Sequence, residues 1–204
     1  MCAGRSTFSG TRMMKSGTRG IFVSVPLHIS LISLSTNIAL RSTRSISPTM
    51  EAVKRFFSSP RFAVAGASND SNKFGYKLLA WYHEHSLPVT PLNPRAPSID
   101  LSPSHSYKTV ASPSALPSPA QTSLSVVTPP AVTLPLLQEA HSVGIPAVWL
   151  QPGTFDNAVL EFARSHFEAV IAGDGGRGSE GWCVLVDGEE GLDAAGVEWT
   201  SQRL

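Results

Sequence analysis

A glycine turn at residues 66–68 is the first feature of this sequence whose residue types suggest chemistry. Residues 62–65 before it are apolar, as a buried strand would be, and a helical pattern follows it. In a strand, turn and helix of this kind, backbone N–H groups and the positive end of the helix dipole converge on one point. We therefore expect an anion site suited to a phosphate. Its candidate residues are Gly66, Ala67, Ser68, Lys73 and Gly75.

The glycine spacing alone does not name a ligand. The full dinucleotide-binding fingerprint has three glycines within six residues, and this turn departs from it. A purely structural turn between strand and helix is therefore the alternative interpretation.

The end of the second predicted strand, residues 88–92, narrows the choice of ligand. It is followed by Asn93, Pro94 and Arg95, whereas a NAD site usually has an acidic residue there to accept hydrogen bonds from the ribose hydroxyls. Because that carboxylate is missing and Arg95 can meet a phosphate, the sequence favours a ribose-phosphate ligand such as coenzyme A or NADP. The alternative is that Asn93 only caps a turn.

The elements that must position these residues follow an alternating pattern. Five apolar segments separated by helical patterns predict a Rossmann-like α/β fold, with three α/β/α layers and a mainly parallel sheet of five or six strands. The segments are residues 62–65, 88–92, 124–127, 145–150 and 169–172. We expect an entry helix at residues 53–58 and further helices beginning near Lys73, at Thr133 and after a Thr154 cap.

Parallel strands present their carboxyl ends at one edge of the sheet, where ligands bind near the switch in strand order. This rule adds the turns after the third and fourth segments to the candidate site. The residues added are Thr128, Pro129, Gln151 and Gly153.

Two stretches lack a clear pattern. Residues 96–122 are rich in proline and serine, which predicts mostly loop with a short helix at residues 112–116. Residues 173–181 contain five glycines, which predicts another loop. After it we expect, in order, a sixth strand at residues 182–186, a turn at Asp187-Gly188 and a loosely ordered tail at residues 191–204.

Charge is unevenly distributed along the chain. Six of the sixteen Lys and Arg residues, and none of the fifteen acidic residues, lie in residues 1–49, which are also rich in Ser and Thr. This composition is typical of a mitochondrial transit peptide, so we expect residues 1–49 to be a leader and residues 50–204 the folded domain. A start of translation at Met50 would give a cytoplasmic protein instead. The remainder has a net charge of −5 and no basic stripe, which argues against nucleic-acid binding.

The sequence does not indicate other chemistry. No metal motif, Ser-His-Asp set or catalytic pair stands out, so we expect a binding protein rather than an enzyme. The apolar run at residues 21–40 contains Pro26, His28 and Asn37, and we expect no stable membrane span. Two alternatives stay open: an NAD(P)-dependent oxidoreductase, and a subunit that completes a nucleotide site with a partner chain. A homo-oligomer is also compatible with the sequence.

Four blocks at the predicted strand ends carry a family resemblance. They are Phe62-Ala-Val-Ala-Gly-Ala-Ser68, Val89-Thr-Pro-Leu-Asn-Pro94, Thr128-Pro129-Pro130 and Ala147-Val-Trp-Leu-Gln-Pro-Gly153. Together they resemble the CoA-binding domain family of small Rossmann proteins, which are similar to the N-terminal domain of the succinyl-CoA synthetase alpha subunit. The resemblance implies coenzyme A or acyl-CoA as ligand, with its pyrophosphate at the glycine turn and its adenosine beside Asn93-Pro94. It implies no ligase activity, because the catalytic histidine of the synthetase lies in a domain that this sequence lacks.

Overall fold

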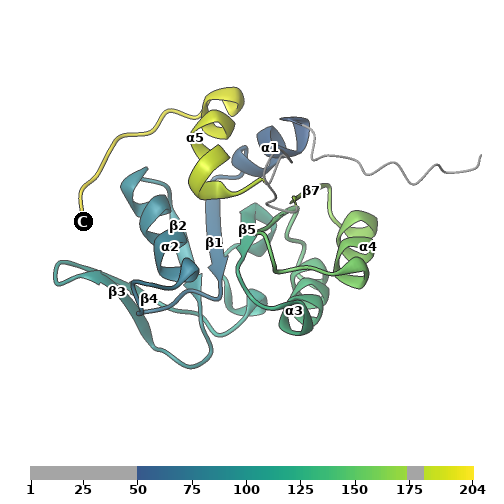
Figure 1. Ribbon diagram of the computed structural model, residues 1–204, viewed down its shortest axis with the longest axis horizontal. Helices are drawn as coiled ribbons and strands as arrows, with labels where there is room; N and C mark the ends of the chain where they lie inside the picture. The colour runs from purple at the N-terminus through teal and green to yellow at the C-terminus, as the bar shows by residue number, and fades with distance from the viewer. Residues whose placement is uncertain (1–49, 174–181) are drawn as a thin grey trace, which may run out of the picture. The chain divides into compact units, whose positions relative to one another are not determined.

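The structure, a computed structural model, describes residues 50–173 and 182–204. The predicted leader and residues 174–181 of the glycine-rich loop lie outside these residues. At the centre is a sheet in the order β2-β1-β5-β6-β7, in which every neighbouring pair of strands is parallel (Figure 1). The strands are β1 (Arg61–Ala65), β2 (Val89–Leu92), β5 (Thr122–Val126), β6 (Ala147–Leu150) and β7 (Ala169–Ala172). The α/β fold and the five predicted strands are confirmed.

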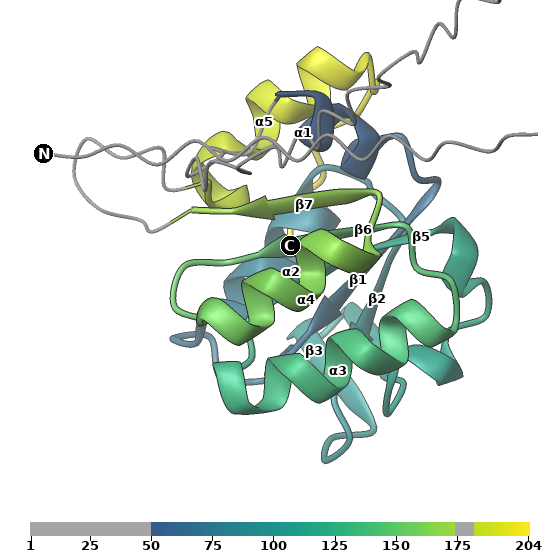
Figure 2. The same ribbon diagram turned by 90° about the vertical axis from the view of Figure 1, so that its right-hand side faces the viewer.

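Side chains of the strands alternate between two apolar layers. In β1, Phe62 and Val64 pack among the helices of one face, whereas Ala63 and Ala65 pack among those of the other. The first face is covered by α1 (Met50–Phe57), α2 (Phe74–Glu84) and α5 (Val184–Ala195), and the second by α3 (Pro130–Ser142) and α4 (Asn157–His166) (Figure 2). Strands covered on both faces are usually mostly apolar, and four of the five follow this rule, whereas β5 also buries Thr122, Ser123 and Ser125. No helix within the described ranges is long and apolar enough to span a bilayer.

The order of the strands places a switch point beside β1. From β1 the chain passes through α2 to β2 on one side, and it then returns to β5 on the other side of β1. In open parallel sheets the crevice for a ligand lies at such a reversal, outside the carboxyl ends of the strands. The glycine turn follows β1 directly and therefore lies at this point.

Three helices begin at residues other than those predicted. Helix α1 begins at Met50, three residues before the expected start at residue 53. Helix α3 begins at Pro130 with Pro129 at its N-cap, three residues before the expected start at Thr133. Helix α4 is capped by Asp156, whose carboxylate accepts a hydrogen bond from the third backbone N–H of the helix at 2.9 Å, and not by Thr154. Proline at the first helical position lacks an N–H group that would otherwise be unpaired, and aspartate at the N-cap accepts a hydrogen bond from another free N–H group. These two effects account for the observed starts of α3 and α4.

The stretch predicted as mostly loop contains an antiparallel hairpin. Its strands are β3 (Ser98–Ser102) and β4 (His105–Lys108), and the short helix expected next to it is the 3₁₀ turn Pro113–Ala115. The hydroxyl of Tyr76 in α2 donates to Leu101 O at 2.7 Å and holds the hairpin against that helix. Strand β4 is short, polar and partly exposed, whereas in β3 the buried Ile99 and Leu101 alternate with polar residues. This alternation is a strand signal, but it lies within a proline- and serine-rich stretch that predicted a loop.

The predicted sixth strand at residues 182–186 and the turn at Asp187-Gly188 are wrong, because α5 occupies this segment. Its glycines are the reason for the error. A Cβ on Gly188 would lie 2.4 Å from Cζ2 of Trp81, and a Cβ on Gly191 would lie 2.6 Å from Cγ1 of Val53. These glycines therefore let α5 pack closely on α1 and α2, whereas in the sequence they indicate a turn.

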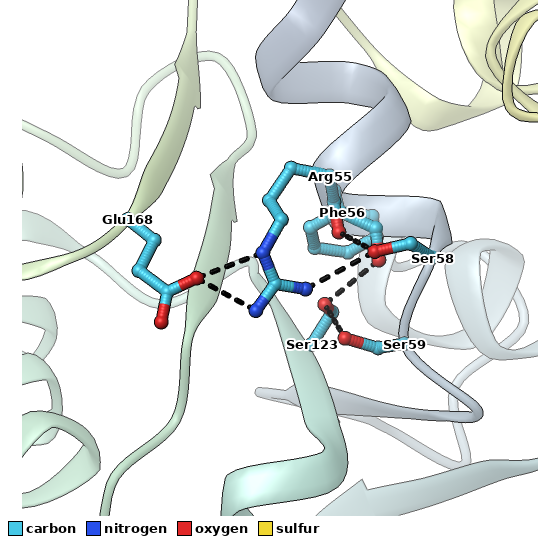
Figure 3. A network of polar contacts seen from close by, with 6 residues as sticks. All are labelled: Arg55, Phe56, Ser58, Ser59, Ser123 and Glu168. Atoms are coloured by element: carbon cyan, nitrogen blue, oxygen red, sulfur yellow. Dashed lines mark hydrogen bonds and ion pairs between the residues drawn. The ribbon is translucent and has the colours of Figure 1, made fainter.

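A polar network fixes α1 at the amino ends of the strands, opposite the switch point (Figure 3). The guanidinium of Arg55 contacts the carboxylate of Glu168 at 2.7 Å from Nη2. The hydroxyl of Ser123, which is fully buried, lies 2.8 Å from both Phe56 O and the hydroxyl of Ser59. The network holds the helix to the sheet at the edge away from the candidate site.

Candidate functional site

A pocket of about 440 Å³ opens at the carboxyl ends of β1, β2 and β5, which is the position that the strand-end rule predicts. Eight of the twelve predicted binding residues line it: Gly66, Ala67, Ser68, Lys73, Asn93, Pro94, Arg95 and Thr128. The other four, Gly75, Pro129, Gln151 and Gly153, do not line this pocket, and their contact with a ligand stays a prediction.

The glycine turn depends on two glycines for different reasons. Gly66 has φ +90° and its N–H donates to Leu92 O at 3.2 Å, so it bends the chain in a conformation that L side chains rarely adopt. Gly75 is in the first turn of α2, where an added Cβ would lie 2.1 Å from Gly66 O. Gly75 therefore brings the start of α2 against the turn and acts on the pocket indirectly.

The pocket carries positive charge and free hydrogen-bond donors at this end. Lys73 is the N-cap residue of α2, and the helix has no side-chain cap. Ser68 Oγ accepts a hydrogen bond from the backbone N–H of Asp70 at 3.1 Å and keeps its own proton as a donor. The exposed side chains of Lys73 and Arg95 form no ion pair with any described residue. Two cations beside an uncapped helix start favour an anionic ligand.

The side chain of Asn93 serves the backbone around it. Its Nδ2 donates to Ala67 O at 2.8 Å, and its Oδ1 accepts from the N–H groups of Arg95 and Ala96 at 2.8 and 3.2 Å. The amide thus ties the end of β2 to the glycine turn and caps the next turn. This is the structural role that the sequence left open as the alternative, and it still leaves the end of β2 without a carboxylate for a ribose diol.

The wall opposite the turn comes from α3, and sequence reasoning missed it. Val132, Pro135, Leu136 and Glu139 line the pocket. Their spacing of i, i+3, i+4 and i+7 marks one helix face, and this signal could have found them. Leu136 therefore faces the pocket, whereas the buried face of α3 is formed by Thr133, Leu137 and Ala140. The hydroxyl of Thr128 contacts that of Thr133 at 2.9 Å and so joins the turn after β5 to this helix.

The turn after β6 supports α5 rather than the pocket. Gln151 is 1% exposed, and its Oε1 accepts a hydrogen bond from the N–H of Val184 at 3.2 Å, at the start of α5. Gly153 has φ +86° in the same turn. These residues place α5 after the glycine-rich loop, which explains why they lie outside the pocket described above.

Other reactive groups lie elsewhere. Among the described residues no three His, Cys, Asp or Glu side chains cluster as metal ligands. Burial raises the pKa of the Cys183 thiol, which does not suit a nucleophile. A second hollow, of about 720 Å³, is lined by Ser86 and by residues of α5 and the tail, among them Asp193 and Glu198, with no cation. It does not suit a phosphate.

Comparisons with known proteins agree with this geometry. The family model described as "CoA binding domain" matches residues 60–175. A conserved hypothetical protein from Pyrococcus furiosus is 26% identical, with a TM-score of 0.52 over 62% of this chain and 97% of its own. A search of curated proteins finds no match.

Two further solved structures share the fold. A protein from Thermus thermophilus is 24% identical with a TM-score of 0.57, over 70% of this chain and 98% of its own. A hypothetical protein from Pyrococcus horikoshii is 19% identical with a TM-score of 0.58, over 71% and 92% of the two chains. Since the family model covers more than half of the sequence and its match spans the whole pocket-bearing sheet, the chain belongs to the CoA binding domain family.

Proposed function

We propose that this protein binds coenzyme A or an acyl-CoA in the pocket at the switch point, as a binding protein without a reaction of its own. The observation that carries the proposal is that three features converge on one pocket: the glycine turn, the uncapped start of α2, and the side chains of Lys73 and Arg95, which form no ion pair among the described residues. The family to which the chain belongs supports the same ligand.

The shape of the pocket supports a nucleotide. Its volume of about 440 Å³ is within the range of roughly 300–1,000 Å³ typical of small-molecule sites. The phosphates would be held by the backbone of the turn, by Ser68 and by Lys73, and Arg95 would meet the phosphate on the ribose. The flat base would lie against the apolar face of α3. No residue of this set supplies an obvious nucleophile.

NADP is the second candidate, because Arg95 could meet its ribose phosphate as well. NAD is disfavoured, because the amide of Asn93 is engaged by the backbone and no carboxylate takes its place at the end of β2. An oxidoreductase would also need an acid or base beside the nicotinamide. The ionisable side chains that line the described pocket are Lys73, Arg95 and Glu139, and we assign the two cations to phosphates.

A thermal-shift series on the full chain tests the ligand. Coenzyme A at about 100 times its dissociation constant should stabilise the fold by roughly 2.7 kcal/mol. We expect coenzyme A or acetyl-CoA to raise the melting temperature more than NAD⁺ or NADP⁺ at equal concentration. Stabilisation by NADP⁺ alone would contradict the proposal, and no shift with any of the four would favour a site completed by a partner chain.

The location of the protein is a separate proposal. The acid-free, basic, Ser-rich composition of residues 1–49 supports mitochondrial import and removal of this segment. N-terminal sequencing of the protein isolated from its native cells would show a start inside or after this segment. A native start at Met50 with a cytoplasmic pool would contradict it.

A further inference from the structure

Among the residues that the structure describes, Glu139 is the one acidic residue that lines the pocket, and its position is unusual. It follows Val132, Pro135 and Leu136 on the same face of α3, so a carboxylate ends an otherwise apolar wall. The glycine turn, Lys73 and Arg95 form the anionic-ligand end of the pocket, together with the end of β2. A carboxylate in a pocket that favours anions needs a separate explanation.

The hydrogen bonds of Glu139 are divided unequally between its two oxygens. Oε1 accepts from the hydroxyl of Ser112 at 2.6 Å, from the backbone N–H of Ser114 at 3.0 Å, and from the hydroxyl of Ser114. Within residues 50–173 and 182–204, no hydrogen bond involves Oε2. Three donors saturate one oxygen, and the other remains an acceptor.

These contacts keep the carboxyl group ionised. Partial burial alone would raise its pKa, but the hydrogen bonds from Ser112 and Ser114 outweigh this effect and hold the pKa of Glu139 below its ordinary value. An ionised oxygen at the edge of an apolar wall is best satisfied by a hydrogen-bond donor on the ligand. The hydrogen bonds of Oε1 hold the 3₁₀ turn at residues 113–115 to α3. This structural role explains the position of Oε1 but gives no role to Oε2.

The chemistry of the wall and of Oε2 together identifies the base. An apolar face of a helix suits a flat heteroaromatic ring, and a single free carboxylate oxygen suits a single amino group on its rim. Adenine carries such a group at position 6, where hypoxanthine carries an oxygen acceptor that a carboxylate oxygen would repel. Guanine would donate two hydrogen bonds to a carboxylate, one to each oxygen. Oε1 already accepts its hydrogen bonds from Ser112 and Ser114, so it is not available for a second bond of this kind.

We propose that Glu139 is the residue that selects the base of the nucleotide, by accepting a hydrogen bond from the 6-amino group of adenine at Oε2. This proposal rests on the proposed function, because it requires a nucleotide in this pocket. It adds a specificity determinant that lies on α3, away from the phosphate-binding turn. Glu139 acts by positive contact with a donor and by repulsion of a 6-oxo base.

The test compares two bases on the same phosphates. Calorimetry on the full chain measures the affinity for adenosine 3′,5′-bisphosphate, inosine 3′,5′-bisphosphate and coenzyme A. We expect the adenosine compound to bind at least about tenfold more tightly than the inosine compound, the size of effect given by one hydrogen bond to a charged group. Glu139→Gln should abolish or reverse this preference, because the amide can keep the serine contacts through its oxygen and present N–H groups to the base.

A matched control is Glu161→Gln, since Glu161 is an exposed residue of α4 outside the pocket. It should keep the preference of the unaltered protein. A purely structural role of Glu139 would lower all three affinities in parallel and leave their ratio unchanged, and that result would overturn the proposal. Equal binding of the two bisphosphates to the unaltered protein would overturn it as well.

Two measurements keep the outcomes distinct. If Glu139→Gln does not fold, as judged by its thermal transition, the unaltered protein is titrated with purine riboside 3′,5′-bisphosphate, which lacks only the 6-amino group. It should bind more weakly than the adenosine compound but more tightly than the inosine compound, because it lacks the donor without adding a 6-oxo group. Affinity equal to that of the adenosine compound would overturn the proposal. If coenzyme A binds and the bases are not distinguished, the specificity proposal alone fails. If neither coenzyme A nor any bisphosphate binds, the proposed function fails with it.

Discussion

At the scale of single residues, the candidate site separates residues that shape the pocket from those able to contact a ligand. Gly66, Gly75 and Asn93 use their conformation, their lack of a Cβ or their amide to build the turn. Lys73 and Arg95 have no such structural task, since both are exposed and neither forms an ion pair among the described residues. Binding energy for a phosphate is therefore expected from the two cations.

Arg95→Ala tests the assignment of the ribose phosphate. We expect it to weaken coenzyme A binding about five- to tenfold, the lower end of a charged hydrogen bond because Arg95 is exposed. The affinity for dephospho-CoA, which lacks the ribose phosphate, should fall less than about twofold on the same substitution. Calorimetry gives both affinities, with Arg164→Ala on the exposed surface of α4 as the control. An equal loss for the two ligands would place Arg95 elsewhere along the ligand.

The sequence predicted those site residues that leave a local pattern, and it did not predict the others. The turn after β1 and the end of β2 were predictable, because glycine after an apolar run and proline at a strand end leave local signals. The face of α3 that lines the pocket was missed, because its apolar residues look like core residues until the sheet is assembled. The role of the Asn93 amide depends on Ala67, 26 residues away, and no local pattern reveals such a contact.

At the scale of elements, α5 and the hairpin show where propensity misleads. Glycines lower the helix propensity of α5 by about 1 kcal/mol each relative to alanine, yet they lie where the helix meets α1 and α2. Packing across the contact therefore decides the conformation of this segment. The hairpin is likewise held by α2, through bonds such as that from Tyr76, and the short alternation of β3 alone did not outweigh the proline- and serine-rich composition around it.

Gly188→Ala tests this account of α5 by the sign of its effect. In an exposed helix alanine would stabilise, but here the added methyl group would lie 2.4 Å from Cζ2 of the buried ring of Trp81. We expect a loss of about 1–3 kcal/mol in the free energy of unfolding, as for other overpacked contacts. Urea denaturation measures it, with Glu190→Ala, at an exposed position of the same helix, as the control. A gain in stability would mean that the contact is loose.

The attachment of α1 allows a matched pair of substitutions (Figure 3). Ser123→Ala removes a fully buried hydroxyl that contacts Phe56 O and Ser59, and we expect it to cost about 1–2 kcal/mol. Arg55→Ala removes an ion pair whose side chains are 40% and 63% exposed, and its cost should stay below about 1 kcal/mol. Urea denaturation of both variants compares them. A larger loss from Arg55→Ala would show that the surface pair, and not the buried hydroxyl, fixes the helix.

At the scale of the whole molecule, the parallel sheet was predictable and the pieces that close around it were not. Most strands of the sheet are largely apolar runs flanked by turn residues. The local sequence therefore predicts the layers, and the rule that ligands bind at the carboxyl ends of parallel strands predicts the edge that holds the ligand. The hairpin, α5 and the tail meet the sheet through contacts distant in sequence, such as that of Gln202 N–H with Glu84 O at 2.8 Å. The conformations of these three segments are therefore determined by their packing against the rest of the fold and not by their local sequence.

The meeting point of α2, the hairpin and the tail gives the last prediction, which concerns acid stability. His83 is 3% exposed; its Nδ1 lies 2.7 Å from the hydroxyl of Tyr107 and its ring is 4.5 Å from that of His105. Burial, with the nearby His105, lowers the pKa of His83 despite opposing effects of Glu84 and the backbone of Arg203.

Because the unfolded chain then binds more protons, the free energy of unfolding should fall as pH drops below the ordinary histidine pKa of about 6.5. The Glu139 carboxyl, whose pKa is lowered, titrates at still lower pH and does not disturb this window. We expect His83→Gln to lose less stability between pH 7 and pH 5.5 than the unaltered protein, as measured by urea denaturation at each pH. An unchanged slope in His83→Gln would mean that acid weakens the fold at another site.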